Sequence, residues 1–253
     1  SCANSVYSFS GPRLSFSQHA KRVRLSITPT AHAVFALPLG TVAAVAIFAH
    51  ALAAGAGEYG PRWHQAALKK QRNKAYEDFE AVASDLIARG VTSPSKLGCQ
   101  GGSNGGLLTG NMLARDSAGS RLFGAIVCQV PLLDMKRFHM LLAGASWMGE
   151  YGNPDTEDWT FLRIYSPYHN LNEAGPYPPI LFTTSTRDDR VHPGHARKMV
   201  NKLVDMGKPG VYYYENMEGG HGGAADNKQR AFMSTLAYDF LEQALTGKLE
   251  IGD

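Results

Sequence analysis

The sequence has little net charge and lacks the patterns that mark several classes of binding protein. Its 253 residues carry 25 Lys and Arg against 22 Asp and Glu, and no basic stripe alternates with aromatic residues, which argues against a nucleic-acid partner. The glycines at 55 and 57 do not begin a G-x-G-x-x-G fingerprint, so no dinucleotide is expected. His192 and His195 have no third ligand nearby, and we expect neither a metal nor any other cofactor.

Cysteine is scarce, and its positions bear on the compartment. The three cysteines, Cys2, Cys99 and Cys128, fit no metal-type spacing. Cys99 and Cys128 fall inside predicted core strands, where a buried free thiol is the usual state. Free thiols suit a reducing compartment, so we expect a cytoplasmic protein, and a secreted or periplasmic location remains the alternative.

No long stretch of the sequence is uninterruptedly hydrophobic. Residues 31–56 are apolar and rich in alanine, but histidine, proline and glycine interrupt them. Three interpretations remain open: a signal-peptide-like segment behind the basic residues at 21–24, a membrane span, and a core strand at 41–50. Because alanine gives weak hydrophobicity, the core strand is favoured and no membrane partner is expected.

From residue 58 onward, predicted strands alternate with predicted helices. Continuous apolar runs, typical of strands that a parallel sheet buries on both faces, lie at 96–100, 124–130, 179–184 and 211–215. Helix-compatible stretches lie at 75–89, 107–115, 193–206 and 227–245, and the segment 132–177 is irregular. This alternation predicts an α/β fold with a mostly parallel sheet and helices on both faces.

One glycine-rich stretch joins a predicted strand to a predicted helix. Gly101, Ser103 and Gly105 form G-x-S-x-G, the pattern of a nucleophile elbow, in which a strained turn exposes a serine hydroxyl at a helix N-terminus. Side chains at either glycine would collide with the strand or the helix, so both positions are expected to require glycine. Backbone N–H groups at such a helix start can hold an oxyanion. Taken alone, the pattern fits an ordinary glycine-rich turn as well as it fits a nucleophile elbow.

An acidic pair and a histidine follow two later strands. Asp188 and Asp189 come after the strand at 179–184, and His221 lies between glycines after the strand at 211–215. The order Ser, Asp, His is that of the α/β-hydrolases. We therefore expect Ser103, His221 and one of the two aspartates to converge at one edge of the sheet as a catalytic triad.

Several stretches of the sequence share their pattern with one known family. They lie at 57–60, 101–108, 130–135, 166–168, 188–191 and 219–221. Together they resemble the catalytic domain of the prolyl oligopeptidase family of serine peptidases (peptidase S9), over about three quarters of the chain. The resemblance implies an α/β-hydrolase fold and a hydrolase that cleaves short peptides on the carboxyl side of proline through an acyl-enzyme, without a cofactor.

The resemblance also implies roles for individual residues. Ser103 is the nucleophile, His221 the base, Asp188 the acid that orients the imidazole, and the Asn104 N–H an oxyanion donor. Arg190 binds a peptide carbonyl near the cut, with a surface ion pair as the alternative. The implied proline pocket consists of Trp147, Tyr151, Leu132, Val191 and the Asn104 side chain, with Trp147 stacked on the proline ring or, alternatively, packed under a loop.

The N-terminal part departs from this family. The family carries a β-propeller before the catalytic domain and a tyrosine as second oxyanion donor, and residues 1–57 show neither. With serine as the first residue, this predicts a fragment or a diverged N-terminus, and a loss of about 10²–10³ in turnover. We expect an atypical segment with degenerate first strands at 1–57 and a catalytic domain at 58–253. A broad esterase or aminopeptidase-like hydrolase with the same triad, and an inactive fragment, are the alternatives.

Overall fold

A computed structural model of the chain describes residues 7–8, 21–22, 45–46 and 60–251. Most of the predicted segment 1–57, including Cys2, lies outside the described residues. Its described parts are three two-residue strands: β1 (Tyr7–Ser8), β2 (Lys21–Arg22) and β3 (Val45–Ala46). β3 falls within the stretch 41–50, where the sequence favours a core strand, and it pairs in parallel with β4 (Leu97–Gly102).

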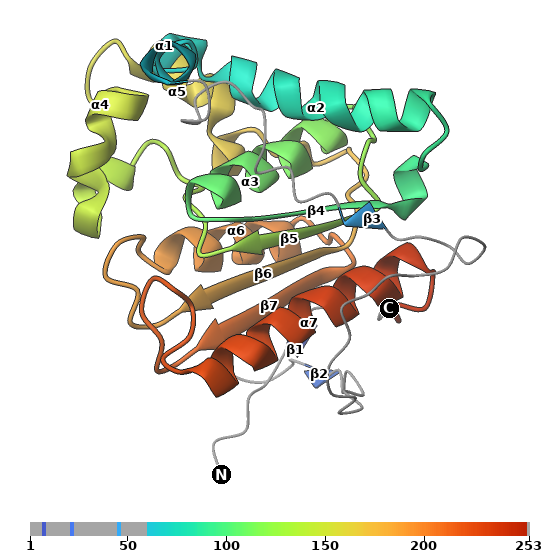
Figure 1. The fold of residues 1–253 in the computed structure, drawn as a ribbon. Coiled ribbons are helices and arrows are strands. Elements are labelled where there is room, and N and C mark those ends of the chain that lie inside the picture. The colour runs from blue at the N-terminus through green and yellow to red at the C-terminus, as the bar shows by residue number, and fades with distance from the viewer. Residues whose placement is uncertain (1–6, 9–20, 23–44, 47–59, 252–253) are drawn as a thin grey trace.

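One sheet contains seven strands of the described residues, in the order β2-β1-β7-β6-β5-β4-β3 (Figure 1). The strands from β3 to β7 run parallel, whereas β1 pairs antiparallel with both β7 and β2. The central strands after β4 are β5 (Ala125–Gln129), β6 (Ile180–Ser185) and β7 (Val211–Asn216). The predicted mostly parallel sheet is therefore confirmed.

Helices cover both faces of the sheet (Figure 1). Within the described residues the four long helices are α2 (Asn73–Ala88), α3 (Asn104–Ser117), α6 (Gly194–Asp205) and α7 (Asn227–Leu245). On β7, Tyr212 and Tyr214 join the apolar cluster formed with α7, whereas Val211 and Tyr213 join the cluster that contains α2, α3 and α6. Because successive strand residues pack against opposite layers, β5, β6 and β7 each begin with a continuous run of apolar residues, as the sequence predicts.

Short helices account for the remaining regular structure. The segment predicted as irregular, between β5 and β6, contains η3 (Phe138–Met140), η4 (Leu142–Trp147), α4 (Met148–Tyr151), α5 (Trp159–Leu162), η5 (Arg163–Tyr165) and η6 (Pro167–His169). Before β4 lie α1 (Pro61–Gln65), η1 (Lys69–Gln71) and η2 (Pro94–Lys96). η1 contacts α4, and Arg72 after η1 and Tyr151 on α4 both reach Asn104 at the start of α3.

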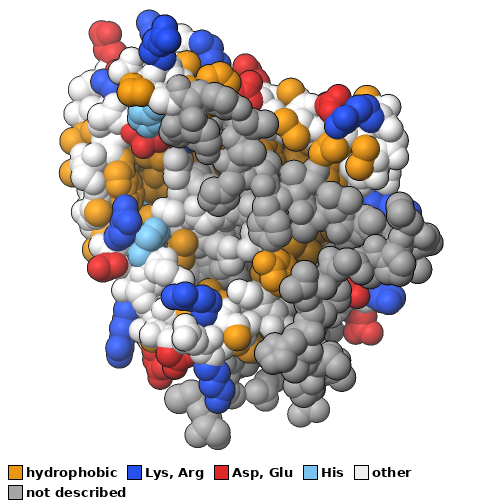
Figure 2. Space-filling view, in the orientation of Figure 1, with side chains coloured by type: hydrophobic (Ala, Val, Ile, Leu, Met, Phe, Trp, Pro, Cys, Tyr) orange, Lys and Arg blue, Asp and Glu red, His pale blue; other side chains and the backbone are white. Residues whose placement is uncertain are grey.

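The core contains both described cysteines as free thiols, as predicted. Cys99 and Cys128 are buried, and burial raises the pKa of each, that of Cys128 to about 12. None of the described helices is long and apolar enough to cross a bilayer. On the face drawn in Figure 2, basic and acidic side chains are interspersed over the described surface.

Candidate active site

Ser103 lies at the junction of β4 and α3, in a strained turn. Its φ is 58° and its ψ is −113°. A positive φ is uncommon for residues other than glycine, so this serine stores backbone strain. Two hydrogen bonds hold the turn: the Ser103 N–H donates to the Gln129 carbonyl at 2.9 Å, and the Ser103 carbonyl accepts the Leu107 N–H at 3.0 Å. The half-buried serine thus stands at the start of a helix, as the elbow pattern predicts.

The glycines around Ser103 do not all serve the same purpose. A Cβ added at Gly101 would lie 2.3 Å from the Gly105 carbonyl oxygen, so glycine is required there as predicted. At Gly105 an added Cβ meets nothing within 4 Å, and the predicted collision at that position is wrong. The second close approach lies one residue later, because α3 packs through Gly106 onto the loop after β5: a Cβ there would lie 2.7 Å from Pro131 Cα.

His221 lies between Ser103 and Asp188. Its Nε2 is 3.0 Å from Ser103 Oγ, and its Nδ1 is 2.9 Å from Asp188 Oδ2. A carboxylate accepts hydrogen bonds, so Nδ1 carries the proton and Nε2 is left to accept from the serine hydroxyl. The neighbouring Asp189 is exposed, and the imidazole contacts Asp188 instead.

Backbone groups hold the Asp188 carboxylate in place. Its side chain is fully buried, and Oδ1 accepts the N–H groups of Arg190 and Val191, each at 2.9 Å. Two backbone hydrogen bonds to one oxygen fix the orientation of the carboxylate. The turn after β6 therefore presents a carboxylate of fixed orientation to the imidazole.

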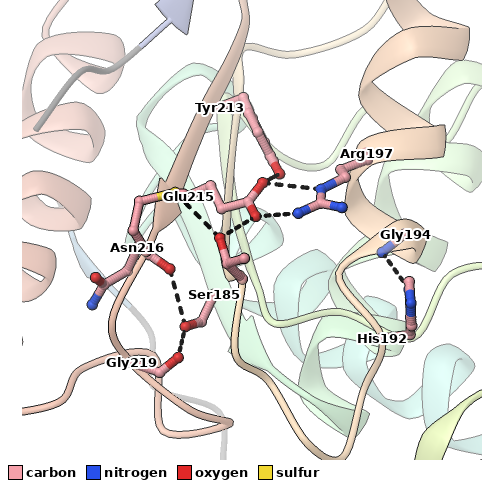
Figure 3. A network of polar contacts seen from close by, with 10 residues as sticks. Ser185, His192, Gly194, Arg197, Tyr213, Glu215, Asn216 and Gly219 are labelled. Carbon is pink, nitrogen blue, oxygen red and sulfur yellow. Dashed lines mark hydrogen bonds and ion pairs between the residues drawn. The ribbon is translucent and has the colours of Figure 1, made fainter.

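The loop that carries His221 is anchored to the ends of β6 and β7 (Figure 3). The Ser185 hydroxyl donates to the carbonyls of Asn216, at 3.1 Å, and Gly219. The Asn216 side chain donates to the Gly223 carbonyl at 2.6 Å and to Gln229 at 2.8 Å. These hydrogen bonds hold the loop at positions before and after the histidine.

A second network lies beside this anchor. Glu215 on β7 accepts hydrogen bonds from Tyr213, Thr186 and Arg197, the last an ion pair with α6 (Figure 3). These interactions hold the pKa of Glu215 below its usual value, against the opposing effect of burial. Because Thr186 follows β6 directly, the network ties together the two strands after which Asp188 and His221 lie.

The residues of the implied proline pocket belong to one apolar cluster. Leu132, Tyr151 and Val191 are buried members of this cluster, and the half-buried Trp147 packs against its edge. Tyr151 also reaches Asn104, since its hydroxyl donates to Asn104 Oδ1 at 2.8 Å.

The two remaining predicted residues present polar groups. Asn104 is the first residue of α3, where a helix leaves its N–H without an intrahelical acceptor. The Arg190 side chain is exposed, and among the described residues it has no ion-pair partner.

Sequence reasoning missed Arg72 and Glu150. Arg72 is buried just before α2, and its guanidinium contacts Glu150 Oε1 at 2.7 Å and Asn104 Oδ1 at 2.5 Å. Burial alone would lower the pKa of Arg72, but Tyr76, Tyr151 and Glu150 raise it above its ordinary value. No motif indicates these two residues, because 78 positions separate them in the sequence.

His192 and His195 have structural partners. His192 Nδ1 accepts the Gly194 N–H at 3.0 Å, and the buried His195 Nδ1 accepts the N–H groups of Leu133 and Asp134 at 3.3 and 3.0 Å. Within the described ranges, no group of three His, Cys, Asp or Glu side chains could hold a metal ion.

Comparisons with known proteins all indicate one family. A sequence model described as "Prolyl oligopeptidase family" matches residues 41–248. An uncharacterized peptidase of Sinorhizobium fredii is 53% identical over 193 residues, 76% of this chain and 26% of that relative. A prolyl endopeptidase of Dictyostelium discoideum is 36% identical over 210 residues, 80% of this chain and 27% of that relative.

Solved structures agree with the sequence matches. A post-proline cleaving enzyme from Rickettsia typhi superposes with a TM-score of 0.74 at 40% identity, over 78% of this chain and 28% of that one. A structure from a study of two prolyl endopeptidases gives a TM-score of 0.73 at 39% identity, over 77% of this chain and 29% of that one. The chain thus spans about a quarter of the length of the curated relatives that it matches.

Proposed function

The chain belongs to the prolyl oligopeptidase family of serine peptidases, and from that membership we propose that it cleaves short peptides on the carboxyl side of proline with Ser103, His221 and Asp188. One observation carries the proposal: His221 Nε2 lies 3.0 Å from Ser103 Oγ while the buried Asp188 holds the other ring nitrogen. Nucleophile, base and orienting acid are then within hydrogen-bond reach of one another, as acyl transfer requires. Residues 58–253 form the catalytic domain in this proposal.

The chemistry follows from this geometry. Ser103 Oγ attacks the scissile carbonyl as His221 Nε2 takes its proton, and Asp188 stabilises the imidazolium. The carbonyl oxygen becomes an oxyanion that the Asn104 N–H stabilises at the start of α3. The intermediate collapses to an acyl-enzyme when the leaving amine takes the proton from His221. Water, deprotonated by the same histidine, then releases the acid and restores Ser103.

A pocket built from the implied residues would suit proline. A proline ring is rigid, apolar and without an N–H, so an indole face is a suitable wall, and Trp147 would take that role. Leu132, Tyr151 and Val191, which belong to the same apolar cluster, would supply the other apolar walls. The exposed guanidinium of Arg190 would bind the carbonyl that precedes the proline, because its planar fork donates to such an oxygen.

A less selective hydrolase with the same three residues is the second candidate. In the described part of the chain, the Asn104 N–H is the only oxyanion donor that we identify. Losing a second donor costs about 10²–10³ in turnover, and an ester, with its better leaving group, tolerates that loss more easily than an amide.

Labelling with a fluorophosphonate tests the proposal. The purified chain should take up one probe molecule on Ser103, located by mass spectrometry of the peptides, and Ser103→Ala should take up none. Soluble, folded wild-type chain that remains unlabelled would reject every hydrolase candidate and favour an inactive fragment. Among labelled chains, an ester reporter turned over far faster than a proline amide would favour the second candidate.

A further inference from the structure

Arg72 connects three parts of the molecule that surround the proposed site. It is 5% exposed, and its two terminal nitrogens reach different partners: Nη1 contacts Glu150 Oε1 at 2.7 Å, and Nη2 contacts Asn104 Oδ1 at 2.5 Å. Its guanidinium carbon also lies 5.2 Å from the centroid of the Tyr151 ring. One side chain thus joins the start of α2, the end of α4 and the first residue of α3.

These contacts determine the orientation of the Asn104 side chain. Oδ1 accepts from Arg72 and from the Tyr151 hydroxyl, at 2.5 and 2.8 Å, and Nδ2 lies 3.4 Å from Glu150 Oε1. A guanidinium can only donate, so the amide oxygen must be the atom that faces Arg72. Asn104 also carries the N–H that we propose as oxyanion donor, and a fixed side chain holds that donor in one position.

The same contacts concern charge. The Glu150 side chain is 26% exposed, and its carboxylate reaches the Asn104 side chain, directly beside the start of α3. An uncompensated negative charge there would oppose the oxyanion that forms on the substrate. The Arg72 guanidinium, always protonated, neutralises it through a direct ion pair.

We propose that Arg72 is a positioning residue of this site, which holds Asn104 and Tyr151 in place and neutralises Glu150 beside the oxyanion donor. The inference rests on the proposed function, because it assigns the residue a part in the same reaction. It predicts two separable effects: lost geometry, which any substitution causes, and an uncompensated charge, which a second substitution at Glu150 can remove.

The test compares Arg72→Met, Arg72→Lys and the double variant Arg72→Met/Glu150→Gln with a matched control. The control is Arg115→Met, because Arg115 on α3 also forms an ion pair with α2, through Glu80 at 2.6 and 2.8 Å. It removes an α2–α3 ion pair at the other end of the same helix. The rate constant for fluorophosphonate labelling and the kcat for a proline amide are measured for each chain, and thermal unfolding reports folding.

Arg72→Met should lower both rates about tenfold to a hundredfold, with a smaller rise in KM from the loosened Tyr151 and Asn104, because the oxyanion forms only in the transition state. Adding Glu150→Gln should restore at least about fivefold of that loss, as coupled neighbours do. Arg72→Lys keeps the charge but lacks the planar fork whose two nitrogens reach Glu150 and Asn104 separately, so it should lose about threefold to tenfold. Arg115→Met should react like the wild type, even if its unfolding temperature falls.

Two patterns would overturn the inference. In the first, Arg72→Met or Arg72→Lys reacts as fast as Arg115→Met. In the second, the double variant is no faster than Arg72→Met, so that no charge effect exists. Either pattern, in chains whose wild type is labelled, leaves the proposed function standing. An unlabelled wild type would reject the proposed function and this inference with it.

Discussion

At the scale of single residues, the turn around Ser103 requires glycine only where a side chain would collide with the backbone. Gly101 faces the backbone of Gly105 at a distance that no Cβ tolerates, whereas Gly105 itself faces open space. The sequence pattern treats both glycines alike, because G-x-S-x-G records only that small residues recur. The packing of α3 separates their roles, and it adds Gly106, which the pattern does not include.

Alanine substitutions should separate these two glycines. Gly101→Ala must displace backbone, so we expect a loss of about 1–3 kcal/mol of stability together with most of the labelling of Ser103. Gly105→Ala, in the first turn of α3, should be neutral or gain up to about 1 kcal/mol, because alanine favours the helix. Chemical unfolding and fluorophosphonate labelling measure both effects, and equal losses in the two variants would contradict this account.

His195 should make stability depend on pH. Burial lowers the pKa of His195 from 6.5 to about 4, and in its neutral form Nδ1 accepts the N–H groups of Leu133 and Asp134. Because the pKa is lower in the folded chain, the unfolded chain binds more protons between these values. The stability due to His195 is therefore complete above pH 6.5 and is lost as the pH falls toward 4.

His195→Gln tests this dependence, because its side chain can accept the same hydrogen bonds without titrating. Between pH 7 and 5, the wild type should lose about 2 kcal/mol more unfolding free energy than the variant. Groups that titrate in this range without contacting His195 are present in both chains and cancel in the comparison. Parallel pH profiles for the two chains would show that the histidine is charged or exposed.

At the scale of elements, the strands were predictable and the connections between them were not. Strands buried on both faces are mostly apolar along their length, so β5 and β6 are visible in the sequence as apolar runs. The start of α3 was missed by three residues, because Asn104, Gly105 and Gly106 have poor helix propensity and only the turn at Ser103 makes them helical. The short helices between β5 and β6 depend on tertiary contacts for their stability. They therefore leave no helical period in the sequence.

Asn216 should be needed to hold the loop after β7, which carries His221, in its position. Asn216→Ala removes the hydrogen bonds to Gly223 and Gln229 that grip the loop carrying His221. We expect kcat for a proline amide to fall about tenfold with KM nearly unchanged, because a misplaced base affects the chemical step.

Asn201→Ala is the matched control for this prediction. Asn201 is exposed on α6, and its side chain donates to Asp205 within the same helix. The control should leave kcat unchanged. If the two variants had the same kcat, the anchoring of the histidine loop would not matter for the reaction.

At the scale of the whole molecule, one parallel sheet brings distant segments to a common edge. Ser103, Asp188 and His221 follow β4, β6 and β7, and their order and flanking strands were enough to predict that they converge. The ion pair of Arg72 with Glu150 was not predictable, because it depends on how η1 and α4 pack beside α3. Sequence order thus predicts that residues which follow parallel strands meet at one edge of the sheet. Which other residues contact and position them depends on tertiary packing.

The chain spans about a quarter of the length of its curated relatives. The central claim is that this chain itself performs the proposed reaction. The most direct measurement is hydrolysis of a proline-reporter peptide by the purified 253-residue chain and by Ser103→Ala under the same conditions. The account predicts cleavage after proline by the wild type, and a rate at least about 10⁴-fold lower for Ser103→Ala. Equal rates for the two chains would contradict it.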